Sequence, residues 1–131
     1  VAPSIRETFD PTMFARLSDD IGALDRLVDS LAVAGGSDQL KLVCQRYYYA
    51  GLVACIENLC LSPHGVSSIE RSARLHDMLE AQRTRQMVTA LKGNHRGLGL
   101  FYGSIASAKP TRCALYTHLA AFFNRSGART V

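Results

Sequence analysis

The chain has 131 residues, of which 47% are apolar and 20% are charged, and its formal net charge is +4. This length suits one compact domain, since single cores commonly form at ~100–150 residues, and the apolar content excludes extended disorder. No uncharged apolar run reaches the ~18 residues that cross a bilayer, so we expect no membrane association.

The charges are distributed unevenly along the chain. Residues 1–36 carry three basic and six acidic side chains, whereas residues 67–131 carry ten basic and three acidic ones. Twelve of the fifteen cations are arginine, whose planar guanidinium pairs bidentately with phosphate and carboxylate. The sequence therefore predicts an acidic N-terminal helix and a basic C-terminal half that attracts an anionic partner.

The first predicted helix follows an extended segment at residues 1–10. Asp10 suits the N-cap, and Pro11 suits the first helical position because its missing N–H needs no partner there. Apolar residues recur at helical spacing over residues 13–31, and Gly35-Gly36 ends the helix. Ser18-Asp19-Asp20 offers a second start, which would divide it.

A central helix is predicted over about residues 38–61. Its middle, YYYAGLVACIENLCL, is apolar nearly all round, which is typical of a helix buried on most sides. Gly51 costs roughly 1 kcal/mol of helix propensity, so we expect it where a neighbouring helix approaches closely. Glu57 lies either on an exposed strip of this helix or beside a basic partner such as Arg46.

A third apolar stripe begins at Ser67-x-x-Glu70, a capping box, and runs to Gly93. The polar stretch Gln82–Arg85 interrupts this stripe. One long helix with a solvated turn and two shorter helices both fit the pattern.

The C-terminal part predicts a weaker helix over residues 97–108 and a last helix from Lys109-Pro110 to about Asn124. The residues that we expect the last helix to bury are Cys113, Leu115, Leu119, Phe122 and Phe123. The fold class is all-α, a single compact domain of four to six helices over residues 11–124, with a flexible tail at 125–131. The start at Val1 leads us to expect a fragment of a larger regulatory protein.

Basic side chains of the C-terminal half form the main candidate site. Arg71 and Arg74 are three residues apart, on one helical face, and further cations follow along the stripe. Together they predict one basic edge that binds nucleic acid, DNA or RNA, through its phosphates. The predicted residues are Arg71, Arg74, Arg83, Arg85, Lys92, His95 and Arg96. The alternative is an ordinary solvated face, or one that docks an acidic protein surface.

The glycine-rich stretch LKGNHRGLGLFYG, residues 91–103, permits two interpretations. Backbone N–H groups in such a turn can form an anion-binding concavity, with Lys92, His95 and Arg96 at its rim. The alternative is a structural corner, in which Gly93 ends one helix and small residues lie where two helices cross.

The longer stretch ALKGNHRGLGLFYGSIA resembles the core signature of histidine phosphotransfer domains, which are four-helix proteins. In that family a histidine two residues before Leu-Lys-Gly accepts the phosphoryl group, and Thr89 stands at this position here. Because threonine cannot form a phosphoramidate, the resemblance implies a degenerate, non-phosphorylated relative.

The triplet Tyr47, Tyr48 and Tyr49 predicts a protein interface. Three successive residues point about 100° apart around a helix, so at least one ring reaches the surface. Exposed aromatic rings beside apolar surface mark protein contacts, or stack on single-stranded bases. The second functional hypothesis is therefore a homodimerisation or protein-interaction domain, and a homo-oligomer is expected under either hypothesis.

Four cysteines lie within apolar helical patterns, which indicates reduced core thiols and an intracellular protein, cytoplasmic or nuclear. A secreted bundle with two disulfides remains the alternative. Cys55 and Cys60 are five residues apart, so their side chains diverge by about 140° and hold no metal ion between them. No catalytic motif stands out, and we expect neither an enzyme nor a bound cofactor.

Overall fold

The computed structural model describes residues 9–32, 37–62, 66–94, 97–99 and 101–125. Within these ranges the chain forms six helices and no strand, which confirms the all-α prediction. The helices are α1 (Met13–Ala32), α2 (Ser37–Leu61), α3 (Ser68–Glu80), α4 (Gln82–Leu91), α5 (Phe101–Ala106) and α6 (Pro110–Arg125). Residues 1–8 of the predicted extended segment and residues 126–131 of the predicted tail lie outside the described residues, whereas Arg125, which the prediction placed in the tail, ends α6.

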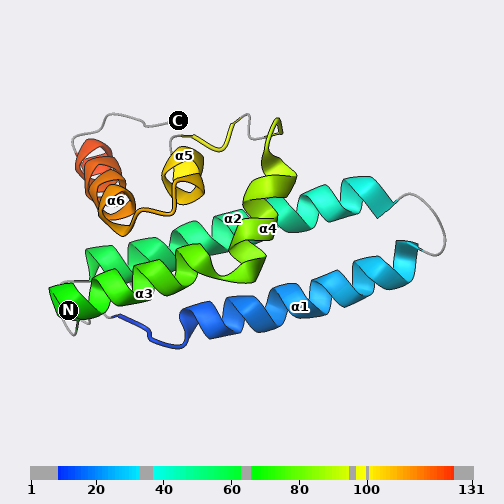
Figure 1. The fold of residues 1–131 in the computed structure, drawn as a ribbon, viewed down its shortest axis with the longest axis horizontal. Coiled ribbons are helices and arrows are strands. Elements are labelled where there is room, and N and C mark those ends of the chain that lie inside the picture. The colour runs from blue at the N-terminus through cyan, green and yellow to red at the C-terminus, as the bar shows by residue number, and fades with distance from the viewer. Residues whose placement is uncertain (1–8, 33–36, 63–65, 95–96, 100, 126–131) are drawn as a thin grey trace.

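Helices α1 and α2 form an antiparallel hairpin that spans the molecule (Figure 1). α1 is continuous from Met13 to Ala32, so the possible restart near Asp19 does not divide it. Its buried stripe packs on α2. A Cβ atom added at Gly51 would meet the Cδ1 methyl of Leu17, so α1 approaches α2 closely at this glycine, as expected.

α2 is the central helix, because it contacts α1, α3, α4 and α6. Its side chains toward these neighbours are fully buried, among them Tyr48, Leu52, Ile56 and Leu59. α4 crosses α2, and α5 and α6 lie on the other side of α2 from α1 (Figure 1). The core therefore surrounds α2 on most sides and leaves one strip of it uncovered.

α1 begins two residues later than expected. The Asp10 carboxylate still caps the chain entry, since it accepts hydrogen bonds from the Thr12 N–H at 2.9 Å and the Thr12 hydroxyl at 2.7 Å. The Asp10 N–H donates to Asn58 Oδ1 at 2.9 Å, which ties this entry to α2. At the start of α3, Ser67 Oγ accepts from the Glu70 N–H at 3.1 Å, as the capping box predicts.

The chain breaks between α3 and α4 at Ala81, whose φ and ψ are −56° and 137°. Two shorter helices are thus formed, one of the two predicted alternatives. The turn is not solvated, however, because Thr84 is fully buried. The Thr84 hydroxyl donates to the Met78 carbonyl at 2.7 Å and lies 2.7 Å from the Tyr48 hydroxyl, which must therefore be the donor of that second bond. The buried hydrogen bonds from Tyr48 to Thr84 and from Thr84 to the Met78 carbonyl stabilise the bend between α3 and α4.

Candidate functional site

The predicted basic residues of α4 point to opposite sides of that helix. Arg83 donates to Asp25 Oδ2 at 3.1 Å and Oδ1 at 3.2 Å, and also to Gln45 Oε1. Its guanidinium lies 5.2 Å from the centroid of the Tyr48 ring, and its side chain is 18% exposed. Arg83 therefore joins α4 to α1 and α2 and is largely used within the fold.

Arg85 binds three backbone carbonyl groups on the other side of α4. It donates to Leu79 O at 2.8 Å, to Ala106 O at 3.1 Å and to Ile105 O. These acceptors lie in the last turns of α3 and α5, where carbonyl groups lack partners within their own helix. The guanidinium thus caps two helix C-termini at once and also complements their negative dipole ends.

Arg83 and Arg85 consequently do not share one basic edge, which corrects the expected layout. Two residues along a helix correspond to about 200° of rotation, and each guanidinium has found acceptors on its own side. Lys92 is exposed at the end of α4. His95 and Arg96 lie outside the described residues.

The two arginines of α3 also have different surroundings. Arg74 pairs with Glu70 at 3.1 Å and lies 5.0 Å from the centroid of the Phe9 ring. Arg71 is half-buried near Cys60, and its Nε atom has no hydrogen-bond partner among the described residues.

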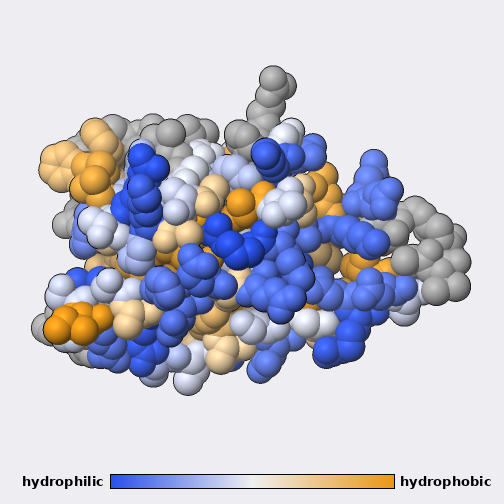
Figure 2. Space-filling view, in the orientation of Figure 1, coloured by the Kyte–Doolittle hydropathy of each residue, from blue (hydrophilic) through white to orange (hydrophobic). Residues whose placement is uncertain are grey.

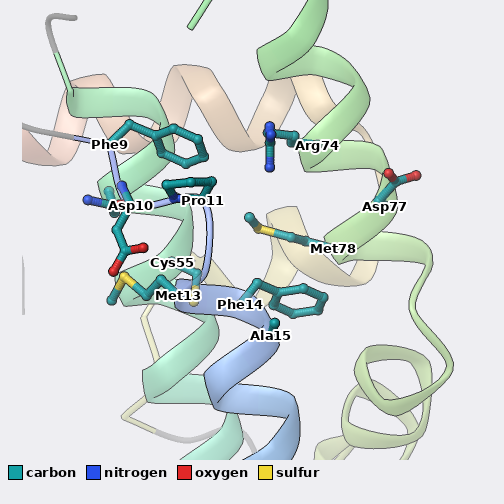
Figure 3. A pocket seen from close by; sticks show the side chains of 11 residues that line it. Phe9, Asp10, Pro11, Met13, Phe14, Ala15, Cys55, Arg74, Asp77 and Met78 are labelled. Atoms are coloured by element: carbon teal, nitrogen blue, oxygen red, sulfur yellow. The ribbon is translucent and has the colours of Figure 1, made fainter. Parts of the chain in front are cut away.

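A cavity of about 210 Å³ lies below Arg74, between the chain entry and α3. Figure 3 shows Arg74 and Met78 facing Phe9 and Pro11 across it. Its deeper wall includes the thiol of Cys55, and burial raises the pKa of that thiol to about 11. Asp10, Asn58, Arg74 and Asp77 add polar groups to an otherwise apolar lining.

The glycine-rich stretch is built as a corner over its described residues. Gly93, Gly97 and Gly99 have φ values of +87°, +85° and +75°, a region that favours glycine. Its carbonyl groups accept hydrogen bonds from α2: Arg46 donates to Asn94 O and Tyr49 donates to Leu98 O, each at 2.8 Å.

The segment that resembles the phosphotransfer signature does not continue as one helix. α4 ends at Leu91, before Lys92 and Gly93. Thr89 is exposed on α4, and its hydroxyl donates to Arg85 O at 3.1 Å. The Leu-Lys-Gly motif therefore marks the end of α4, and it joins the corner described above.

The three tyrosines divide between core and surface. Tyr48 and Tyr49 are buried and donate to Thr84 and Leu98, whereas Tyr47 is 49% exposed. Tyr47 is thus the ring that reaches the surface, as the predicted interface requires.

Tyr47 belongs to a row of residues on one side of α2, whose first four members are exposed and whose last three are half-buried among the described residues. We call this row the outer stripe; it consists of Leu40, Val43, Tyr47, Ala50, Ala54, Glu57 and Leu61. Its members are separated by three and four residues in alternation, and Val43 is 60% exposed. Ala54 and Gly51 line a groove of about 270 Å³ with Arg16 and Asp20 of α1, which shows that the stripe and this side of α1 share one face.

Two exposed leucines of α1, Leu27 and Leu31, are separated by four residues and extend this apolar face. The sequence hides the outer stripe, because α2 is apolar on every side. The small residues Ala50 and Ala54, repeated in the same row, were the signal that could have revealed it.

A second apolar face lies on α6, where the prediction of burial is wrong. Cys113 is fully buried, but Leu115, Leu119, Phe122 and Phe123 are 57%, 42%, 64% and 43% exposed. Figure 2 shows the hydrophobic surface over the C-terminal end of α6. We call these four residues the α6 face. Its rings and leucines recur at helical spacing, but the core contacts of α6 are made on the opposite side, by Cys113 and Thr117.

All four cysteines are buried and free. Among the described residues no group of three metal-ligating side chains lies together, and no helix there is long and apolar enough to cross a membrane. No family model matches the chain, and neither does a curated protein or a solved structure.

Proposed function

We propose that this domain is a non-catalytic protein-interaction module of a regulatory protein, which docks partners through its exposed apolar helix faces. The observation that carries the proposal is that the exposed large apolar side chains of the described residues, apart from Ile69 of α3, lie either on the hairpin face of α1 and α2 or on the α6 face. Contiguous exposed apolar surface of this kind marks interaction sites in proteins whose core is otherwise complete.

The internal use of the arginines favours protein docking over nucleic-acid binding. Arg83 and Arg85 make hydrogen bonds that a phosphate group would have to replace. Removing the Arg85 bonds takes a donor away from carbonyl groups at two helix ends, which costs more than a surface contact returns. Among the cations that remain for an anionic partner, Lys92 is exposed at the end of α4, and Lys109 and Arg112 line a groove with Leu115 and Leu119 of the α6 face.

The buried thiols support the non-catalytic and intracellular parts of the proposal. Burial raises the pKa of Cys60 to about 11, as it does for Cys55, so both remain protonated at neutral pH. A protonated buried thiol is a poor nucleophile, and four free cysteines fit a reducing compartment.

The proposal is tested by measuring the mass of the chain in solution together with its binding to labelled duplex DNA and single-stranded RNA. Salt is varied over ~50–300 mM, a range in which phosphate binding weakens steeply. We expect self-association that persists at high salt and no salt-dependent binding to either nucleic acid. A monomer that binds DNA or RNA steeply with salt would contradict the proposal.

Lys92→Glu and Arg85→Glu provide the matched comparison. Under the proposal Lys92→Glu changes neither mass nor stability, while Arg85→Glu lowers the stability of the fold. Loss of nucleic-acid binding from Lys92→Glu in a folded chain would instead restore the basic half as the binding site.

A further inference from the structure

We infer that the chain forms a symmetric homodimer in which the outer stripe of α2 packs antiparallel against the same stripe of a second copy. The inference rests on the proposed function and identifies a second copy of the chain as the partner of the α1–α2 hairpin face. Four observations support it: the spacing of the stripe, its self-complementary shape, the charges beside it and its area.

The spacing is that of a helix–helix seam. Residues 40, 43, 47, 50, 54, 57 and 61 alternate in steps of three and four, which keeps them on one side of a helix over three heptads. Steps of this kind are needed for a seam against another helix, but none of the six described helices packs on the exposed part of the stripe. Leu40, Val43 and Tyr47 are instead 41%, 60% and 49% exposed.

The stripe is self-complementary when its direction is reversed. A two-fold axis between Ala50 and Gly51 pairs residues whose numbers add up to 101. The large Tyr47 then meets the small Ala54 of the second copy, and Ala54 meets that copy's tyrosine. At the centre Ala50 of one copy is level with Gly51 of the other; Leu17 of α1 covers one side of Gly51, so the close contact is made by the small Ala50 side chains. Isologous dimers require this reciprocal match of one patch to itself.

Charge complementarity favours the same pairing. Glu57, at one edge of the stripe, and Arg46 beside it lie on the side that faces away from Gly51 and α1, as their helical positions show, and Arg46 also donates to Asn94 O within its own chain. In the antiparallel pairing Glu57 of one copy stands within two residues, ~3 Å along the axis, of the level of Arg46 in the other. The two-fold axis brings these flanks together twice. In a parallel pairing Arg46 would lie beside Arg46 of the second copy and Glu57 beside Glu57, and these like charges would repel.

The area is sufficient for a reversible dimer. The stripe extends ~32 Å along α2, and with α1 beside it the face is ~20 Å wide, which gives ~600 Å² of projected surface. Two such faces approach the ~1,200–2,000 Å² total of specific interfaces, at its lower end. We therefore expect a dissociation constant in the micromolar range rather than an obligate dimer.

Cysteine cross-linking tests the direction and register of the pairing. Ala50→Cys places two thiols beside the two-fold axis, so mild oxidation with diamide should give a covalent dimer. Val43→Cys should not cross-link, because residue 43 of the second copy would lie 15 residues, ~22 Å, away along the helix axis. The native cysteines are buried, and Ser72→Cys, at an exposed site on α3, controls for random collision. Cross-linking by both stripe variants would indicate a parallel seam and overturn the inference, as would cross-linking by neither.

A pair of charge substitutions separates this inference from the proposed function. Tyr47→Glu should weaken self-association at least tenfold without changing the helix content, and Leu119→Glu on the α6 face should leave it unchanged. Loss of association from Leu119→Glu alone would overturn the α2 dimer but keep the protein-interaction function. A chain that is monomeric throughout and binds nucleic acid would overturn both.

Discussion

The arginines of α4 and the outer stripe of α2 reverse the usual relation between chemistry and location. Arg83 and Arg85 are cations that contact acceptors within the fold, whereas Val43 and Tyr47 are apolar side chains that face solvent. The difference lies in what each helix side meets. α4 has the Asp25 carboxylate on one side and the carbonyl groups of two helix ends on the other, but the outer side of α2 contacts no other helix of the described chain. Available acceptors, more than net charge, decide which surface remains for a partner.

The largest effect is expected at Arg85. Arg85→Ala removes donors to three carbonyl groups at the ends of α3 and α5, and we expect the free energy of unfolding to fall by ~2–4 kcal/mol. Urea denaturation at a fixed protein concentration measures this loss. Lys92→Ala, at an exposed site, is the control and should change stability by less than ~0.5 kcal/mol. Equal small effects from both variants would show that Arg85 does not hold these helix ends.

The buried side of α2 should respond to alkaline pH, unlike its outer stripe. Cys55 and Cys60 have folded-state pKa values of about 11, above the ordinary thiol value of 9.0. Their contribution to stability is complete below pH 9 and is lost as pH rises toward 11, because the unfolded chain releases these protons first. At pH 10 the free energy of unfolding should fall by ~1 kcal/mol per thiol relative to pH 8.

Cys60→Ser and Cys55→Ser provide the check on this pH effect. Each substitution should reduce the drop in stability between pH 8 and pH 10, whatever it does to stability at neutral pH. A drop that both variants retain in full would assign the alkaline effect to other groups. Tyr49 is one such group, since burial raises its pKa to about 12.

Arg83 should contribute less than Arg85, since its main partner, the Asp25 side chain, is 42% exposed. Arg83→Ala is expected to cost ~1–2 kcal/mol, with a coupling to Asp25→Ala of ~1 kcal/mol in a double-mutant cycle. Thermal denaturation of the two single variants and the double variant measures it. Additive effects would mean that the ion pair is screened and that Arg83 acts through Gln45 and the Tyr48 ring instead.

The smallest effect is expected at Gly51, beside the outer stripe. Gly51→Ala gains up to ~1 kcal/mol of helix propensity, but its Cβ displaces the end of Leu17, so a net loss of ~1 kcal/mol is expected. In a Leu17→Ala chain, which is itself less stable, adding Gly51→Ala should cost less than it does in the unmodified chain, because the methyl groups that clash are then absent. A Gly51→Ala chain that is more stable than the unmodified one would show that α1 can move away at little cost.

Helix starts could be predicted because they depend on residues close together in the sequence, and a close helix approach at Gly51 could be predicted because a glycine within a helix is itself the signal. Ser67 caps α3 as its spacing with Glu70 indicates, and Ala81 divides a stripe that was already interrupted. The roles of the arginines could not be predicted in this way. Asp25 is 58 residues from Arg83, and the carbonyl of Ala106 is 21 residues from Arg85, so only the tertiary arrangement brings them together.

The two apolar faces were missed for a related reason. Periodicity shows that one side of a helix is apolar, but it does not show whether another helix covers that side. In α6 the predicted core positions Leu115 and Phe122 remain exposed, while Cys113 packs inward. In the middle of α2 every side is apolar, so the exposed side could not be distinguished from the buried sides by residue type.

The most direct test of a functional outer stripe is the urea midpoint of the unmodified chain at two protein concentrations ~100-fold apart, which bracket a micromolar dissociation constant. Because dimer formation stabilises only the folded chain, we predict a higher midpoint at the higher concentration, and no such rise in Tyr47→Glu. The same midpoint at both concentrations in the unmodified chain would contradict the dimer and leave the exposed stripe without its proposed partner.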